Sequence, residues 1–440
     1  MLKQALMFIL FLLPALAFPA DNLLDAAKEG DVAFIEAYHG AVDAPLDENG
    51  LTALIWAAYS GKIGPVKALI AKKADVNAVG KGGVTALMIA AEMGHTEIFN
   101  ELIAAKADID KSAENGITAL MLAACQPRTD TVMALIAAKA DVNAVEKNGE
   151  TALDKAKGYG KQEIVVLLMI AGGKANVAGV AGDDSTAWMI AAEYGITNAI
   201  KLLLESAADV NEVDKDGETA LMKAAQNGHL NFFNVLIDAN ADVNASDKNG
   251  MTALMWAARY GHTDTVKALI AAKADVNASD KNGNTALMWV ALSGHIDTVK
   301  ALIAAKAEIN VSVVYGYTAL MIASANGHTD VMKELIAAKA DVNATSKGGV
   351  TALMLAAYDG HTDAVKALIA TEADVNAVDK DGWTALKLAS ANGHTDVVKE
   401  LIAAKADVNM VDKDGKTALE YAKGKGNKEI VDLLKKAGAK

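Results

Sequence analysis

Seven of the eight histidines recur at one position of a repeated pattern, which raises the possibility of a metal site or of proton transfer. They are His95, His229, His262, His295, His328, His361 and His394. A metal ion needs three or four ligands within about 2.0–2.3 Å, whereas equivalent positions of stacked units lie about 8–10 Å apart. We therefore expect these side chains to be turn residues at the start of a helix, without a metal.

Other chemistry-bearing residues lack the partners that catalysis requires. The segment 209–217 is rich in Asp and Asn, but its spacing does not match the ligand positions of a calcium-binding loop. Cys125 is the only cysteine, which excludes an internal disulfide, and no histidine of its own unit lies beside it. The chain also has no complete G-x-x-x-x-G-K-[ST] phosphate loop, no G-x-S-x-G and no H-E-x-x-H motif. We predict no enzymatic activity and no cofactor, and leave the role of Cys125 open.

The tripeptide Thr-Ala-Leu marks a period of 33 residues along almost the whole chain. It begins at Thr52, Thr85, Thr118, Thr151, Thr219, Thr252, Thr285, Thr318, Thr351, Thr384 and Thr417, with a Thr-Ala-Trp variant at Thr186. A fixed period of this length indicates stacked units, each of which buries its apolar face against its neighbours.

One unit, residues 252–284, shows the expected local structure. Leu254, Ala257 and Ala258 form an apolar stripe on a helix that should stop at Gly261. The residues 262–264 are expected to cap a second helix. The remainder of the unit should be extended and end in an Asn-Gly tip, which is typical of a tight hairpin-like turn.

This unit resembles the ankyrin repeat, whose pattern is T-P-L-H-x-A-A…G-H…A-D-V-N-A. The resemblance covers residues 21–440, although Ala replaces the family's Pro in every unit and Met replaces its His in eight of twelve. It implies an all-α repeat solenoid of helix-turn-helix units with β-hairpin loops, about 12 full repeats and an N-terminal capping unit. It also implies a non-enzymatic scaffold that binds a protein partner through its concave face.

The predicted organisation has five parts: a signal peptide, an N-terminal capping repeat, repeats 1–4, an irregular Gly-rich insertion, and repeats 5–12 with a C-terminal cap. Their ranges are 1–17, 18–50, 51–171, 172–185 and 186–440. The Gly-rich insertion is either a hinge or a tolerated loop insertion, and the sequence leaves both open.

The N-terminus has one positive charge, Lys3, followed by an apolar stretch over residues 5–18 and an A-x-A site at 15–17. This order is typical of a signal peptide, so we expect cleavage after Ala17 and a secreted or periplasmic protein. Cleavage after Ala20 and an uncleaved anchor are the alternatives, and the final destination, including a host, is open. After cleavage we expect no stable membrane anchor and a monomer.

The net charge is −13, with 55 acidic against 42 basic residues. An acidic surface repels phosphate backbones, so nucleic acid is excluded as a partner, and basic or mixed-charge proteins are favoured.

The family resemblance places partner contacts at the hairpin tips and at the exposed end of each first helix. Interfaces are enriched in Tyr, Trp and Arg. The resulting candidates are Tyr159, Tyr194, Arg259, Tyr260, Tyr317, Tyr358 and Trp383. Alternatively, several of them cover neighbouring units. Trp56, Trp256 and Trp289 share another position and are expected to pack within the stack. The partner's identity is open, and a host-directed effector, a structural spacer and a protector of an envelope enzyme remain alternative functions.

Overall fold

The computed structural model describes residues 22–173, 186–206 and 208–440. The predicted signal peptide and most of the predicted Gly-rich insertion lie outside these residues. The chain divides into two compact units. The first takes in the described residues up to Ala191 together with Ile196–Ala208, and the second comprises Ala192–Gly195 and Asp209–Lys440.

Apart from α2 of the capping unit, the first helix of each repeat begins directly after the repeated threonine. In the first unit these helices are α2 (Asn22–Glu29), α4 (Ala53–Ser60), α6 (Ala86–Met93), α8 (Ala119–Ala124) and α10 (Ala152–Gly158), and α12 (Ala187–Tyr194) crosses the boundary between the units. In the second unit they are α14 (Ala220–Asn227), α16 (Ala253–Tyr260), α18 (Ala286–Ser293), α20 (Ala319–Ala325), α22 (Ala352–Asp359), α24 (Ala385–Asn392) and α26 (Ala418–Gly424).

The predicted start and stop signals of these helices are confirmed in α16. The backbone N–H of Met255 donates to Thr252 Oγ1 over 3.4 Å, which satisfies one of the amides that a helix start leaves unpaired. Gly261 ends the helix at φ +74°, a left-handed conformation that glycine adopts without steric cost.

A second helix follows the first in each repeat. In the first unit they are α3 (Val32–Ala37), α5 (Ile63–Ala71), α7 (Thr96–Ala104), α9 (Thr129–Ala137), α11 (Gln162–Ile170) and the pair η2 (Thr197–Ala199) and α13 (Ile200–Glu205). In the second unit they are α15 (Leu230–Asp238), α17 (Thr263–Ala271), α19 (Ile296–Ala304), α21 (Thr329–Ala337), α23 (Thr362–Ile369), α25 (Thr395–Ala403) and α27 (Lys428–Lys436).

The histidines stand at the start of these second helices, as expected, but the expected side-chain cap is absent. His262 is the N-cap residue of α17, and no side chain there accepts an amide of the helix. Its ring contacts the preceding repeat instead, where Nε2 lies 2.9 Å from the carbonyl oxygen of Gln226 at the end of α14. The prediction failed because the imidazole is used between repeats rather than within one.

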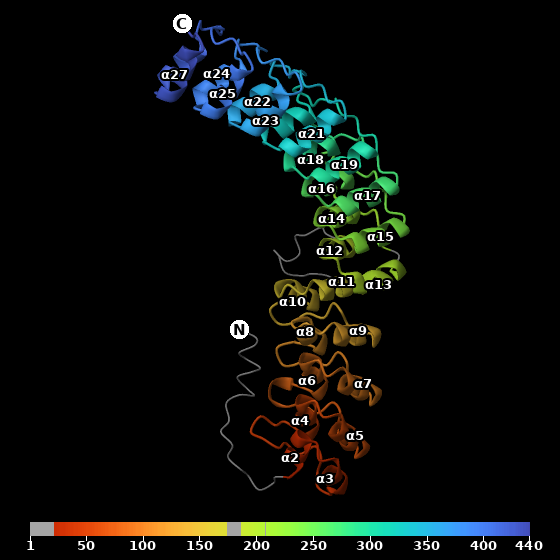
Figure 1. Ribbon diagram of the computed structural model, residues 1–440. Helices are drawn as coiled ribbons and strands as arrows, with labels where there is room; N and C mark the ends of the chain where they lie inside the picture. Colours follow the sequence, from red (N-terminus) through yellow and green to blue (C-terminus); the bar gives the residue numbers. More distant parts are fainter. Residues whose placement is uncertain (1–21, 174–185, 207) are drawn as a thin grey trace. The chain divides into compact units, whose positions relative to one another are not determined.

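The two rows of helices hold the core between them. Within the second unit, α14, α16 and α18 lie side by side, and α15, α17 and α19 form the neighbouring row (Figure 1). The predicted stripe of Leu254, Ala257 and Ala258 is buried, and the alanines allow close approach between helices. The predicted all-α repeat solenoid is confirmed, and none of the described helices has the length and apolar character that a membrane span requires.

The repeated Ala-Asp-Val-Asn sequence links successive repeats through side chains. Asp275 accepts the backbone N–H of Asn277 over 2.9 Å, which closes a local turn. The Asn277 side chain in turn accepts the backbone N–H of Glu308, the next repeat's equivalent of Asp275, over 2.9 Å. The same pair of bonds recurs between most repeats and forms a ladder along the second unit.

The tips are tighter and less sheet-like than the predicted β-hairpins. Asp280 accepts the backbone N–H groups of Asn282 and Asn284, and Lys281 donates its own to the carbonyl of Asn249 in the preceding tip over 2.9 Å. Because a carboxylate takes amides that a strand ladder would use, the described tips show only isolated bridges, such as Ser279 to Thr285.

Candidate partner-binding surface

Arg259 lies among three aromatic rings contributed by two adjacent first helices. Its guanidinium carbon is 4.7 Å from the ring centroid of Trp289, 5.6 Å from that of Trp256 and 5.9 Å from that of Tyr260. Such distances are those of cation–π contacts. We call these four residues the Arg259 cluster.

The helical repeat explains how the cluster assembles. Trp256 and Tyr260 are four residues apart on α16, so their side chains lie on one face, and their rings stack at 6.1 Å with an interplanar angle of 11°. Trp289 occupies on α18 the position that Trp256 occupies on α16, and the two helices pack side by side. The period of 33 residues therefore brings both indoles to the guanidinium.

The cluster holds hydrogen-bond donors that have no acceptor. Among the described residues, Arg259 forms no ion pair, and the indole Nε1 atoms of Trp256 and Trp289 are buried without a hydrogen-bond partner. The equivalent indole of Trp56 donates to Asp47 Oδ2 over 2.9 Å, so this position can be satisfied within a repeat. Buried polar groups are paired in most proteins, and each exception calls for an explanation.

In the repeat of Trp289, the aspartate equivalent to Asp47 already accepts other hydrogen bonds. Asp280 stands in its repeat where Asp47 stands beside Trp56, but its two carboxylate oxygens accept from the side chain of Asn284 over 3.3 and 2.9 Å. Asp280 Oδ1 also accepts two backbone amides. Both carboxylate oxygens of Asp280 therefore already accept hydrogen bonds within their own tip.

At the same position in the first unit, Lys155 is paired and buried. Its Nζ lies 2.5 Å from Glu146 Oε1 and also binds Glu150. Burial acts to lower the pKa of this ammonium, but the hydrogen bonds to the two glutamates outweigh it and raise the pKa. These hydrogen bonds stabilise the charged form of Lys155, so its side chain is unsuited to proton transfer at neutral pH.

Cys125 is half-buried, and its Sγ donates to the carbonyl oxygen of Met121 over 3.2 Å. Burial, only partly offset by Lys155, raises the pKa of the thiol to about 11. The nucleophilic form of cysteine is the thiolate, so this side chain is kept in its unreactive form. Across the described ranges, no group of three or more His, Cys, Asp or Glu is placed to hold a metal.

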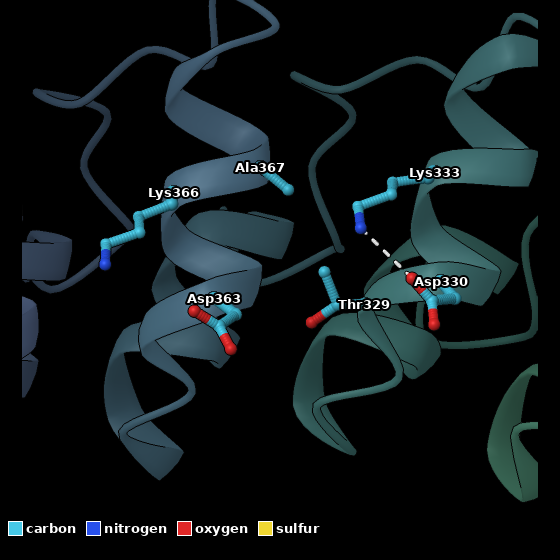
Figure 2. A pocket seen from close by; sticks show the side chains of 6 residues that line it. All are labelled: Thr329, Asp330, Lys333, Asp363, Lys366 and Ala367. Carbon is cyan, nitrogen blue, oxygen red and sulfur yellow. Dashed lines mark hydrogen bonds and ion pairs between the residues drawn. The ribbon is translucent and has the colours of Figure 1, made fainter.

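The row of second helices presents a different surface. A hollow of about 470 Å³ between α21 and α23 is lined by Thr329, Asp330, Lys333, Asp363, Lys366 and Ala367 (Figure 2). Lys333 Nζ lies 3.0 Å from Asp330, and Lys366 pairs with Glu400 at 3.6 Å. The hollow is open and its cations are already paired, unlike the cation of the Arg259 cluster.

Comparison with known families agrees with the repeat geometry. The family model described as ankyrin repeats in three copies matches residues 23–113, 94–179, 159–247, 240–313, 310–379 and 353–440. The chain belongs to the ankyrin-repeat family. A search of curated proteins found no match. Ankyrin repeats are generally protein-interaction modules, and the family is typically non-enzymatic.

Within this ankyrin stack, the structure brings together two of the seven candidate residues, Arg259 and Tyr260. Tyr159, Tyr194, Tyr260 and Tyr358 are exposed, whereas Arg259, Tyr317 and Trp383 are half-buried. Trp383 has an internal contact, because its ring centroid lies 4.5 Å from that of Tyr421 in the following repeat. Tyr159 belongs to the first compact unit, apart from the Arg259 cluster.

Sequence reasoning missed three residues of interest. Trp256 and Trp289 are half-buried, as packing within the ankyrin stack predicts, but they also line the guanidinium of Arg259. Tyr315, at the tip that reads Val313-Val314-Tyr315-Gly316-Tyr317, is 71% exposed. The signal was available, since this tip has Val-Val-Tyr where the preceding tip has Asp-Lys-Asn.

Proposed function

We propose that the protein is a non-enzymatic scaffold that binds a protein partner through the surface formed by its first helices and hairpin tips. This is the face that the family resemblance assigns as concave. The observation that carries the proposal is the contact of Arg259 with three aromatic rings, one of which belongs to the exposed Tyr260. Most other repeats have a small, polar or acidic residue at the position of Arg259, so the fold itself does not require this cluster.

The residue types of the cluster support binding. Tyr, Trp and Arg carry most of the energy at protein interfaces, because they combine a large contact area with directional hydrogen bonds. Arg259 and Tyr260 are presented on a rigid helix, so little ordering entropy is lost when a partner docks. The exposed Tyr315 supplies a further apolar contact at a tip of the same unit.

The proposal is tested by affinity capture from extracts of the protein's own organism. Three baits are compared: the native chain, an Arg259→Ala/Tyr260→Ala variant, and a Lys333→Ala/Lys366→Ala variant in the hollow of Figure 2. We expect a protein that the native and the Lys333/Lys366 baits retain and that the Arg259/Tyr260 bait loses. Circular dichroism verifies that all three baits are folded.

If the three baits retain the same proteins, binding does not use this surface. If the native bait retains none, a structural spacer becomes the better assignment. Both outcomes contradict the proposal, since each removes the role of the Arg259 cluster in partner recognition.

We further propose that the scaffold acts outside the cytoplasm, as a secreted or periplasmic monomer. The order of charge, apolar stretch and A-x-A site in residues 1–17 supports export. N-terminal sequencing of the protein recovered from its own organism tests this, with Phe18 as the expected first residue. Recovery of an intact Met1 from the cytoplasmic fraction would contradict export, and light scattering checks the monomer.

A further inference from the structure

We propose that the Arg259 cluster recognises a carboxylate: the partner docks an extended segment that carries an Asp or Glu side chain next to an apolar one. The inference rests on the proposed function and adds the chemistry of the partner. It also reverses, for this surface, the preference for basic partners that the net charge of −13 suggests.

The charge of the first helices differs from that of the whole chain. The four successive first helices α14, α16, α18 and α20 contain no acidic residue, and their charged residues are Lys223 and Arg259. The second helices of the same repeats carry Asp or Glu, as in α17 and α21. The first helices of these four repeats therefore carry only positive charges, which favours an acidic ligand against them.

Of these two cations, Arg259 is the one without a counter-ion. Lys223 Nζ binds Glu218 and lies 3.5 Å from Asp214. In the described part of the chain, no carboxylate lies within ion-pair distance of Arg259. An incoming carboxylate can therefore pair with Arg259 without displacing an internal partner.

The aromatic rings also orient the guanidinium. An arginine stacks on aromatic rings through the faces of its planar group, which leaves five N–H donors along the edge. That edge matches a carboxylate in a two-bond, bidentate arrangement. With its guanidinium carbon 5.6 Å from the ring centroid of Trp256 and 4.7 Å from that of Trp289, Arg259 is held by two rings and loses little freedom when an acid binds.

The unsatisfied indoles add a second, independent observation. The Nε1 groups of Trp256 and Trp289 are buried donors without an acceptor in the described structure. An acceptor supplied by a partner, with a small movement of the rings, would satisfy them. A carboxylate and the peptide carbonyls beside it provide such acceptors, while the exposed ring of Tyr260 offers contact to an apolar neighbour.

The test uses a library of random linear peptides displayed on phage, panned against the full chain. Selected peptides are synthesised in pairs, one with the native Asp or Glu and one with Asn or Gln in its place. Their dissociation constants are measured by calorimetry for the native chain and for Arg259→Gln, Tyr260→Ala and Lys267→Gln. Lys267 is an exposed cation of the same repeat on α17, so Lys267→Gln controls for the loss of one positive charge.

We expect the selected peptides to be enriched in Asp or Glu beside Leu, Phe or Trp. The amide analogue should bind the native chain at least about tenfold more weakly, since a hydrogen bond to a charged group contributes about that factor. Arg259→Gln should remove the difference between acid and amide, whereas Lys267→Gln should preserve it. In ¹⁵N-tryptophan spectra, two of the five indole N–H signals should shift on binding, and Trp256→Phe and Trp289→Phe assign them.

The outcomes separate this inference from the proposed function. If peptides bind and require Tyr260, but acid and amide analogues bind equally, the surface binds protein and the carboxylate inference is wrong. Equal binding by the native chain and Arg259→Gln has the same meaning. If panning returns no peptide whose binding depends on Tyr260, both the inference and the proposed function fail.

Discussion

The imidazole Nε2 of His262 lies 2.9 Å from the carbonyl oxygen of Gln226, thirty-six residues earlier in the chain. That carbonyl belongs to the last turn of α14, where intrahelical partners are lacking. The same bond joins His229, His328, His361 and His394 to carbonyls of their preceding repeats, at 2.8–3.0 Å. The repeated histidine is thus a connection between repeats.

His262→Ala should lower the free energy of unfolding of the second unit by about 1 kcal/mol, which is a typical net value for one hydrogen bond. Urea denaturation followed by circular dichroism measures the change. His39 is exposed and stands outside the repeat position, so His39→Ala serves as the control and should leave the curve unchanged. Equal curves for both variants would show that the bond does not stabilise the stack.

Gly228 lies against the imidazole of His262. Replacing Gly228 with alanine should therefore lower the stability by more than its left-handed backbone conformation alone explains. At φ +70°, a Cβ would lie 2.5 Å from His262 Nδ1. Gly160 has φ +64° at the equivalent position, but nothing lies within 4 Å of its Cβ. Both alanine variants lose about 1–2 kcal/mol from the left-handed conformation, and we expect a further loss only for Gly228→Ala. Matching losses in thermal melts would contradict the contact.

The fold was largely predictable because its signals are local. The threonine, the paired alanines and the glycine of each repeat set the first helix, and α16 begins and ends where they indicate. The Arg259 cluster was only partly predictable. Arg259 and Tyr260 were chosen by residue type, but the contact with Trp289 joins residues of different repeats and depends on how α16 and α18 pack. Trp383 was chosen by the same rule, yet it contacts Tyr421.

Trp383 contacts another ring whereas Tyr358 is exposed, so their substitutions should change the stability by different amounts. Trp383→Ala removes an aromatic contact at 4.5 Å and should lower the free energy of unfolding by about 1–3 kcal/mol. Tyr358 is 52% exposed, and Tyr358→Ala should change stability by less than about 0.5 kcal/mol. Thermal melts of the two variants decide the matter. A Trp383→Ala variant as stable as the native chain would show that the contact with Tyr421 does not stabilise the stack, which favours a binding role for Trp383.

Lys387 occupies a core position that is methionine in most repeats, and its side chain is buried. Burial holds the pKa of its ammonium below 10.5, although Asp412 and Asp379 act to raise it. The unfolded chain therefore binds more protons between the folded-state pKa and 10.5, so this group makes stability rise with pH across that interval. Below the interval, the cost of burying the charge is fully present.

Lys387→Met should consequently stabilise the second unit, by on the order of 1–2 kcal/mol at neutral pH. Its advantage over the native chain should shrink as pH rises toward 10.5. Urea midpoints measured at neutral and alkaline pH test both statements, with Lys366→Met on the exposed face of α23 as the control. A constant advantage across the whole range would show that the ammonium charge is not its cause.

In the described part of the chain, nine residues other than glycine adopt positive φ angles, and most are the lysine that follows a second helix, such as Lys273 at φ +65°. Gly172 and Gly438 hold the equivalent position in two other repeats, at φ +84° and +95°. A side chain in this conformation costs about 1–2 kcal/mol, and glycine relieves the cost while adding freedom to the unfolded chain. Lys273→Gly should therefore stabilise the protein by about 0.5–1 kcal/mol.

Lys267→Gly, only six residues away but inside α17, should destabilise it by a similar amount, because glycine is unfavourable within a helix. Urea denaturation of both variants compares the two effects directly, and a loss of stability in Lys273→Gly would mean that its side chain makes a contact that outweighs the backbone strain.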